Sequence, residues 1–494
     1  MSTLRLYDTR QKKKVPFEPR EPGRIGIYTC GVTPYDLCHV GHARMFLAFD
    51  VIVRYLRHRG YAVKLVRNVT DVDDKIIRRA QTEGITAAAV AEKYSALMAE
   101  DFRNLHIAPA DEEPRATQNI DEVVGVIGRL VDRGLAYAAG GDVYYAVGQF
   151  EGYGGFSGQS PDDLKAGARI EVGEQKRSPL DFALWKGQKP GEPAWPSPWG
   201  PGRPGWHIEC SAMAWRYLGE TFDIHGGGTD LIFPHHENEI AQSEGAFGRG
   251  TFARHWLHSG MVTFGGEKMS KSLGNVVSIR KVAESNDLEA LRLLMISVHY
   301  RSPVTFTIGT PPMPPFPDLD DAESRLDYFY RTLERLDAFA AGLKAPPGNP
   351  PPQPPSQPVL GQFVGAMDDD FNTAAVIGHL YEAFVYANKL LDDPKALPKP
   401  ERAQTLVALA RDLRVVGGVL GIAARPPAEF LLARRDRLCA RRRIDPGEIE
   451  AAIAERAQAR LAKNFARADE IRQSLKARNV DLMDTPQGTS WRVL

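Results

Sequence analysis

Apolar positions between residues 24 and 74 alternate between two periods. "IGIYTC" (25–30) is a short apolar run, and "ARMFLAFDVIVRYLRHRG" (43–60) carries apolar residues on the 3.6-residue period of a helix that closes at Gly60. "YAVKLVRNVTDVDD" (61–74) is again strand-like. A strand, a helix and a second strand in this order form a βαβ unit, which requires a parallel sheet. The pattern predicts an α/β domain with a Rossmann-type parallel sheet.

Strand-like and helix-like segments continue to alternate up to about Asp287, beyond which the pattern is helical. A region rich in Gly, Pro and aromatic residues runs from about 109 to 233, followed by helical "HHENEIAQSEGAF" (235–247) and strand-like "HWLHSGMVTF" (255–264). The glycines of "HGGGTD" (225–230) match no phosphate-binding motif, so tight packing is expected there. The three aspartates of "AMDDDFNT" (366–373) are expected to cap the helix that follows.

Beyond Asp287 the pattern is mainly helical. "SRLDYFYRTLERLDAFAAGL" (324–343) is predicted to be one amphipathic helix. Its apolar stripe comprises Leu326, Phe329, Tyr330, Leu333, Leu336 and Leu343. The proline-rich segment 345–358 that follows favours extended conformations and is predicted to be a surface loop or spacer.

Composition narrows the class of protein. A chain of 494 residues can hold several domains with large cores. Lys+Arg 62 balance Asp+Glu 62, so a nucleic-acid partner would have to meet a local basic patch. Four scattered cysteines do not form a disulfide framework, and no apolar run is long enough to cross a bilayer. We therefore expect a cytoplasmic protein with no membrane partner.

Two histidines stand at the expected start of the first helix. In "CHVGHARMFLAFD" (38–50), His39 and His42 flank Val40 and Gly41. A metal site, a phosphate site and a buried turn are the three explanations. A helix start after a strand favours phosphate, because free N–H groups and the positive helix end attract anions and Gly41 has no Cβ to obstruct a ligand. The motif is short, and a structural turn remains the alternative from this motif alone.

A second candidate motif is the lysine loop "EKMSKSLGN" (267–275). Lys268 and Lys271 lie three residues apart among small residues, where mobile ammonium groups can follow a polyphosphate. The histidine motif, the lysine loop and the βαβ opening occur in the order that resembles class I aminoacyl-tRNA synthetases. The resemblance implies that His39, Gly41, His42 and Lys271 bind ATP. It also implies catalytic roles for His39, His42, Lys268 and Lys271 in stabilising the reacting phosphate, with no protein nucleophile.

Four further residues form a candidate metal site. Cys30 ends the first strand, Cys210 lies in "GWHIECSAM" (205–213), and His235 and Glu239 are four apart on an expected helix. Sulfur, nitrogen and oxygen donors of this kind suit zinc. By spacing alone no compact metal motif is present, so buried cysteines and a helix-surface His/Glu pair remain the alternative.

The chain resembles cysteinyl-tRNA synthetases over nearly its full length. The matching segments are "RNVTDVDDKI" (67–76), "SPLDFALWK" (178–186), "GWHIECSAM", "AMDDDFNT" and "DTPQGTSWR" (484–492). The resemblance implies one Zn²⁺ per chain, bound by Cys30, Cys210, His235 and Glu239, and Mg²⁺ bound with ATP. It also implies that Thr70, Trp206 and His225 line a cysteine pocket. Zinc would separate an ionisable thiol from the neutral hydroxyl of serine, which shape cannot do well. The family usually reads CGPTVYD where this chain has "CGVTPYD" (30–36).

The resemblance also sets the expected domains and partners. We expect a catalytic domain at 1–285 with an inserted connective region at about 110–205, a helical DALR-type domain at 286–425, and a tRNA anticodon-binding region at 430–494. The expected partners are tRNA(Cys), ATP and L-cysteine, and the expected state is a monomer. In the last region, "ARRDRLCARRR" (433–443) and Trp491 suit phosphate contact and base stacking.

Two alternatives remain open at this point. A cysteine–glucosaminyl-inositol ligase of mycothiol synthesis shares the zinc site and both motifs but lacks the C-terminal third. A non-catalytic synthetase paralogue would be expected to have lost a motif residue or a zinc ligand.

Overall fold

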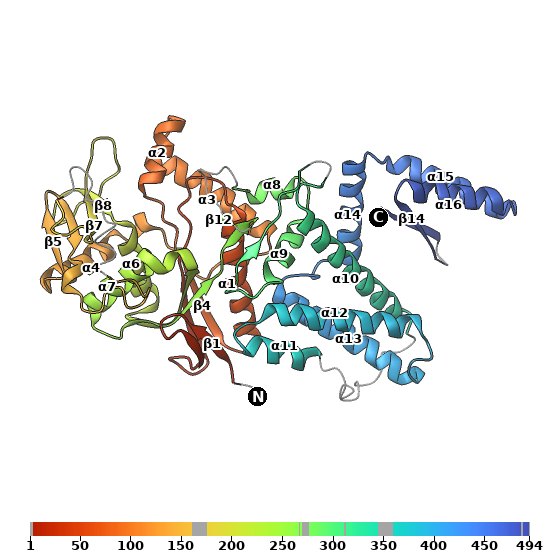
Figure 1. Cartoon of the computed structure of the whole chain (residues 1–494), viewed down its shortest axis with the longest axis horizontal. Coiled ribbons are helices and arrows are strands. Elements are labelled where there is room, and N and C mark those ends of the chain that lie inside the picture. The colour runs from red at the N-terminus through yellow and green to blue at the C-terminus, as the bar shows by residue number, and fades with distance from the viewer. Residues whose placement is uncertain are drawn as a thin grey trace.

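A parallel sheet forms the centre of the computed structural model, which describes residues 3–160, 175–265, 267–268, 276–310, 313–343, 359–485 and 488–493. The strand order is β10-β9-β3-β4 (Figure 1). These strands are β3 (Arg24–Thr29), β4 (Ala62–Arg67), β9 (Thr221–Gly228) and β10 (Phe252–Ser259). Helix α1 (Val40–His58) joins β3 to β4, which pair in parallel. The predicted βαβ unit and α/β class are confirmed.

The strand order reverses between β3 and β9. The chain passes from β3 through α1 to β4 on one side of β3, while β9 and its parallel neighbour β10 extend the sheet on the other side. Loops at the carboxyl ends of the strands diverge at such a reversal and leave a crevice, where ligands bind in open α/β sheets. The N-terminus of α1 lies at this crevice because the loop of residues 30–39 leads from the carboxyl end of β3 to the start of the helix.

The connective region lies beside the sheet, at the left of Figure 1. The hairpin of α2 (Asp74–Glu83) and α3 (Ala87–Asn104) precedes it, and α4 (Ile120–Asp132) begins it. Its antiparallel sheet comprises β5 (Ala136–Ala139), β6 (Asp142–Tyr145), β7 (Phe182–Gly187) and β8 (Gly202–Pro204). The chain returns through α6 (Trp206–Leu218), which packs against α4 and α7 (Glu237–Phe247).

Short elements complete this half of the chain. They are β1 (Arg5–Asp8), β2 (Lys13–Pro16), a π-helical turn η4 (Ile232–His236), β11 (Val262–Phe264), β12 (Glu267–Lys268), α8 (Ile279–Ala283) and β13 (Val304–Thr305), with 3₁₀ turns at Ala116–Gln118, Val147–Gln149 and Thr229–Leu231.

A helical bundle packs against α1. It comprises α9 (Leu288–Ile296), α10 (Pro317–Ala341), α11 (Val359–Asp368), α12 (Thr373–Asp392) and α13 (Lys399–Leu420). The predicted stripe is confirmed from Leu326 to Leu336, where all five side chains are buried, and Leu343 is half-buried. Arg292 of α9 is buried and pairs with Asp50 of α1 at 2.5 Å. Asp50 also pairs with Arg54 at 2.8 Å, so it is removal of Asp50 that would leave Arg292 as an uncompensated buried charge, which costs about 3–5 kcal/mol.

The expected aspartate caps are wrong. Asn372 caps α12 by accepting from the Ala375 N–H at 3.1 Å. Asp370 is fully buried and accepts from the backbone N–H of Tyr7 and the hydroxyl of Tyr300, while Asp368 accepts from Tyr55. These carboxylates therefore attach the bundle to the half of the chain that holds the parallel sheet, and local helix propensity does not reveal such contacts.

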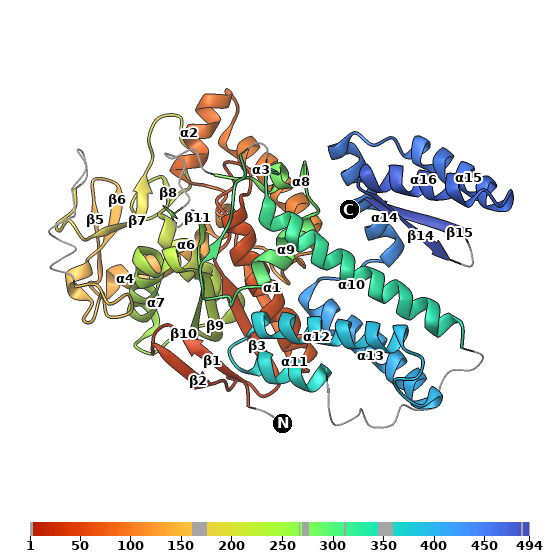
Figure 2. The same ribbon diagram turned by 45° about the vertical axis from the view of Figure 1, so that its right-hand side comes forward.

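The C-terminal unit comprises α14 (Pro427–Arg442), α15 (Pro446–Leu461), α16 (Phe465–Ala477) and a hairpin of β14 (Val480–Thr485) and β15 (Gly488–Val493). It has its own small core and lies across α10 from the sheet, at the end opposite the connective region (Figures 1 and 2). The proline-rich segment 345–358 lies outside the described residues. Among the described helices, none has the length and apolar composition needed to cross a membrane.

Candidate active site

A cavity of about 360 Å³ occupies the crevice at the carboxyl ends of β3, β9 and β10. One wall is the loop after β3, and another is the first two turns of α1, which contribute His39, Gly41 and His42. The segments after β9 and β10 close the opposite side, with Asp230 and Gly260 among their lining residues. Trp206, at the start of α6, and Lys75, in the first turn of α2, complete the lining. The cavity thus lies where the strand order predicts a ligand.

The two histidines form a reciprocal cap at the start of α1. The His42 N–H donates to Nδ1 of His39 at 3.3 Å, and the His39 N–H donates to Nδ1 of His42 at 3.2 Å. Their rings stack with centroids 3.7 Å apart. Because each Nδ1 accepts a hydrogen bond, the proton of a neutral ring is on Nε2, which makes each ring a donor there. Among the described residues, neither histidine belongs to a group of side chains that could hold a metal ion.

The stem of the lysine loop lies against this histidine turn. Lys268 is in β12, which pairs with β11, and Lys271 lies outside the described residues. After the loop, the chain returns through two backbone hydrogen bonds, from Val40 N–H to Val277 O and from Ile279 N–H to Cys38 O. The structure therefore brings the end of the lysine loop next to His39, more than 200 residues away in sequence.

Cys30, Cys210, His235 and Glu239 meet beside the cavity. Their ligand atoms all lie within 4.8 Å of one another, and all four side chains are buried. Nε2 of His235 is 2.6 Å from Glu239, one helical turn away. A hydrogen bond from Cys30 lowers the pKa of the Cys210 thiol to about 6, against the opposing effect of burial. Two sulfurs, an imidazole and a carboxylate fit the donor preferences of zinc.

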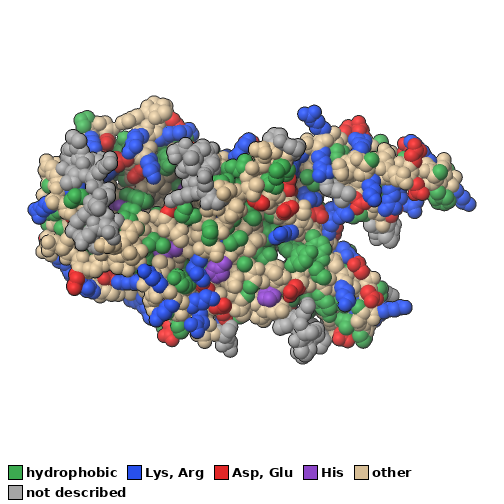
Figure 3. Space-filling view, in the orientation of Figure 1, with side chains coloured by type: hydrophobic (Ala, Val, Ile, Leu, Met, Phe, Trp, Pro, Cys, Tyr) green, Lys and Arg blue, Asp and Glu red, His purple; other side chains and the backbone are tan. Residues whose placement is uncertain are grey.

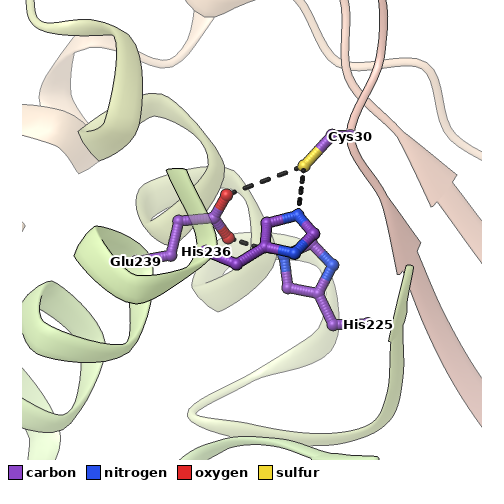
Figure 4. A group of neighbouring side chains, drawn as sticks. All are labelled: Cys30, His225, His236 and Glu239. Carbon is purple, nitrogen blue, oxygen red and sulfur yellow. Dashed lines mark hydrogen bonds and ion pairs between the residues drawn. The ribbon is translucent and has the colours of Figure 1, made fainter. Parts of the chain in front are cut away.

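A second group overlaps the first. His225 and His236 also lie within 4.8 Å of Cys30 and Glu239 (Figure 4). Nε2 of His225 is 2.5 Å from Glu239, and Nε2 of His236 is 3.3 Å from the sulfur of Cys30. Two groups therefore share Cys30 and Glu239. The sequence analysis did not select His236, although it stands directly beside His235 in the printed sequence.

Neutral imidazoles extend behind this site. Nδ1 of His236 bonds to Nε2 of His258 at 2.8 Å, and Nδ1 of His258 bonds to the hydroxyl of Thr9 at 2.8 Å. Burial lowers the pKa of His236 well below its ordinary value and that of His258 to about 3. Burial opposes the charge on Glu239, but attraction to His225 and His235 holds the pKa of this carboxyl well below its ordinary value. A buried anion with sulfur neighbours suits a bound cation.

The three residues expected in a cysteine pocket occupy different depths. Trp206 is 40% exposed, lines the cavity and lies 4.4 Å from His235, measured between ring centroids. Thr70 and His225 are buried and do not line the cavity. Thr70 accepts from the amide of Asn68 at 3.2 Å. Trp206 therefore lies beside both the cavity and the metal-ligand group, whereas Thr70 and His225 lie outside the cavity lining.

The "HGGGTD" glycines allow close packing, as expected. A Cβ on Gly226 would lie 2.1 Å from Cε1 of Phe49 in α1. Only a residue without a side chain lets β9 approach the helix that carries the histidine turn. Asp230, at the end of this segment, and Lys75, from "RNVTDVDDKI", line the cavity but received no role from the sequence. The quoted motifs contained both residues, but spacing alone gave no reason to place them at a ligand.

Family models match three parts of the chain. The model described as "tRNA synthetases class I (C) catalytic domain" matches residues 16–309, "DALR domain" matches 362–424, and "Cysteinyl-tRNA ligase anticodon binding domain" matches 444–492.

Curated relatives match nearly the whole chain. The cysteine–tRNA ligases of Anaeromyxobacter sp. (strain K) and Geobacter metallireducens are 51% and 49% identical, each over 99% of this chain and 100% of the relative. Among solved structures, methionyl-tRNA synthetase of Mycobacterium tuberculosis bound to methionyl-adenylate has a TM-score of 0.61 at 15% identity, covering 83% of this chain and 93% of that one. At this identity the likeness shows a shared fold.

Proposed function

The chain belongs to the cysteine–tRNA ligase family of class I synthetases, and on that premise we propose which of its residues carry out each part of the reaction. It is an enzyme that joins cysteine to tRNA at the expense of ATP. The relatives also span the C-terminal third, which a mycothiol-type ligase lacks, and neither histidine of the first motif has been lost. Both alternatives from the sequence are therefore less well supported.

We place the ATP phosphates at the histidine turn. A carboxylate oxygen of cysteine attacks the α-phosphorus, and pyrophosphate leaves with the electrons of the broken P–O bond. Nε2–H of His39 and of His42, together with the positive end of α1, can stabilise the charge that develops on the phosphate oxygens. Gly41 leaves room for the nucleotide, and Mg²⁺ accompanies ATP. Lys268 and Lys271 are proposed to hold the phosphates from the other side.

Cysteine is proposed to bind between Trp206 and the metal-ligand group. Cys30, Cys210, His235 and Glu239 would hold the zinc ion. The chemistry that zinc supplies in such a site is selection of an ionised sulfur over a neutral hydroxyl. The chain's own residues keep this region dry, since all four ligands are buried and Trp206 lies beside both them and the cavity. Thr70 and His225 support this arrangement from outside the cavity lining.

We propose that tRNA binds the C-terminal unit, where Lys and Arg side chains gather over α14 to α16 (Figure 3). Stacking of a base on Trp491 is not available, because its ring is 6% exposed and its Nε1–H donates to Glu450. Phe465 at the start of α16 is 62% exposed and is therefore available for base stacking, whereas Arg467 pairs with Glu455 and Glu470. Part of the predicted basic cluster is also used internally, since Arg437 pairs with Asp287 at the start of α9 and Arg441 pairs with Asp320 of α10.

The observation that carries this proposal is the meeting of the histidine turn, the metal-ligand group and Trp206 around one cavity. Lys271→Ala tests the activation step. We expect cysteine-dependent ATP–pyrophosphate exchange to fall by about 10²-fold or more in kcat, as for loss of a charge that acts in the transition state. Weaker cysteine binding with an unchanged kcat would contradict the role of Lys271. The monomeric state and the cytoplasmic location stay predictions.

A further inference from the structure

Lys75 is a cation in the active-site cavity without an assigned role. Of the described residues that line the cavity, it alone carries a permanent positive charge. Its ammonium lies 5.5 Å from the centroid of the Tyr35 ring, which lines the same cavity. The side chain is exposed at the cavity mouth, in the first turn of α2.

The surroundings of Lys75 leave its charge uncompensated. The adjacent carboxylate of Asp74 is already paired with Lys186 at 2.7 Å and with Arg203. Within the described part of the chain, Lys75 itself makes no ion pair. The first turn of a helix favours acidic side chains, so a lysine there adds to the positive end of α2 instead of balancing it. The ammonium of Lys75 is therefore available to a phosphate, in a cavity whose other charged lining residues are Asp36 and Asp230.

The aromatic neighbour of Lys75 points to the tRNA end rather than to ATP. Lys75 and Tyr35 line the cavity together with Trp206, whose ring lies 4.4 Å from that of His235 in the metal-ligand group. The histidine turn, where the ATP phosphates are proposed to bind, lines the same cavity. The ribose hydroxyl that accepts the cysteinyl group must reach the cysteine from outside. An ammonium beside an aromatic ring is the combination that holds single-stranded nucleic acid.

We propose that Lys75 and the ring of Tyr35 bind the single-stranded terminal nucleotides of tRNA during acyl transfer, with the ammonium on a phosphate and the ring beneath a base. This rests on the proposed function. In Figure 1 both the α2–α3 hairpin and helices α15 and α16 lie toward the upper side of the molecule. The terminal nucleotides then approach the cavity over α2.

Separate measurement of the two half-reactions tests this role. The variants are Lys75→Gln, Lys75→Arg and the matched control Lys93→Gln. Lys93 lies on the same hairpin, is 49% exposed and stands 5.0 Å from the ring of Tyr94, but it does not line the cavity. The assays are cysteine-dependent ATP–pyrophosphate exchange without tRNA, and single-turnover transfer from enzyme-bound cysteinyl adenylate to tRNA.

For Lys75→Gln we expect exchange to change by no more than about twofold while transfer slows by about five- to tenfold at subsaturating tRNA. The salt dependence of tRNA binding should flatten by about 0.7 in slope, as for one lost phosphate contact on a single strand. Lys75→Arg should restore most of the transfer rate, and Lys93→Gln should match the wild type in both assays.

Equal loss of exchange and transfer would overturn the proposal and assign Lys75 to ATP. Wild-type behaviour of Lys75→Gln in both assays would overturn it too, leaving a solvent-exposed side chain. A wild-type protein that catalyses neither half-reaction would instead contradict the proposed function.

Discussion

The two overlapping ligand groups make opposite predictions for two single substitutions. Cys210 belongs only to the group with His235, and His236 only to the group with His225. Structural zinc sites contribute about 10–16 kcal/mol, so each of four ligands is worth about 2.5–4 kcal/mol, or about 10²–10³-fold in affinity. The loss of zinc affinity for Cys210→Ser should lie at the upper end of this range. A hydrogen bond from Cys30 lowers the pKa of Cys210, so this thiol ionises at a metal at a smaller cost than an ordinary thiol. Ionising an ordinary thiol of pKa 9.0 at pH 7 would cost about 2.7 kcal/mol.

His236→Gln should reduce zinc affinity less than Cys210→Ser does. If the Cys210 group holds the metal, His236 only contacts the ligand Cys30, and its loss should weaken zinc binding by about 10–100-fold. The measurement is zinc affinity by competition with a chromophoric chelator, followed by pyrophosphate exchange with cysteine and with serine. We expect Cys210→Ser to lose zinc and cysteine activation together. If Cys210→Ser kept its zinc within about tenfold of the wild type while His236→Gln lost it, the metal would belong to the His225 group and the reasoning would be refuted.

Three further predictions concern packing, pH and tRNA. Gly226→Ala places a Cβ 2.1 Å from the buried ring of Phe49 and should destabilise the protein by about 1–3 kcal/mol in urea denaturation, and an unchanged midpoint would contradict the packing role. Burial opposes the charge of Asp74, but its two cationic partners lower its pKa to about 2. Asp74→Asn should therefore lower the free energy of unfolding by about 1 kcal/mol at pH 7, after allowance for solvent screening. This difference from the wild type should shrink as the pH falls from 3.8 towards about 2. A difference independent of pH would exclude the ion pairs as its cause. Phe465→Ala should weaken tRNA binding by about 1–3 kcal/mol without loss of thermal stability, whereas Trp491→Ala should lower the unfolding temperature. A reversal of these two outcomes would assign base stacking to Trp491 again.

Local periodicity was enough to predict the βαβ unit and the stripe of α10. Both depend on residues a few positions apart, because the position of a side chain around a helix or on a strand follows from the backbone period alone. The residues around Cys30 and Cys210 were selected by resemblance, since their spacing carries no compact metal motif. Lys271 lies outside the described residues, so its role stays a prediction.

Tertiary structure alone decided which groups share an environment. His236 and His258 reach the cluster because β9, β10 and α7 converge there, and nothing in their spacing indicates that approach. Trp491 was expected to suit base stacking, but the packing of β15 against α14 buries its ring, whereas Phe465 lies at the surface. A residue's type and period are local properties, whereas its burial, its partners and the pKa of its side chain depend on segments that meet only when the chain folds.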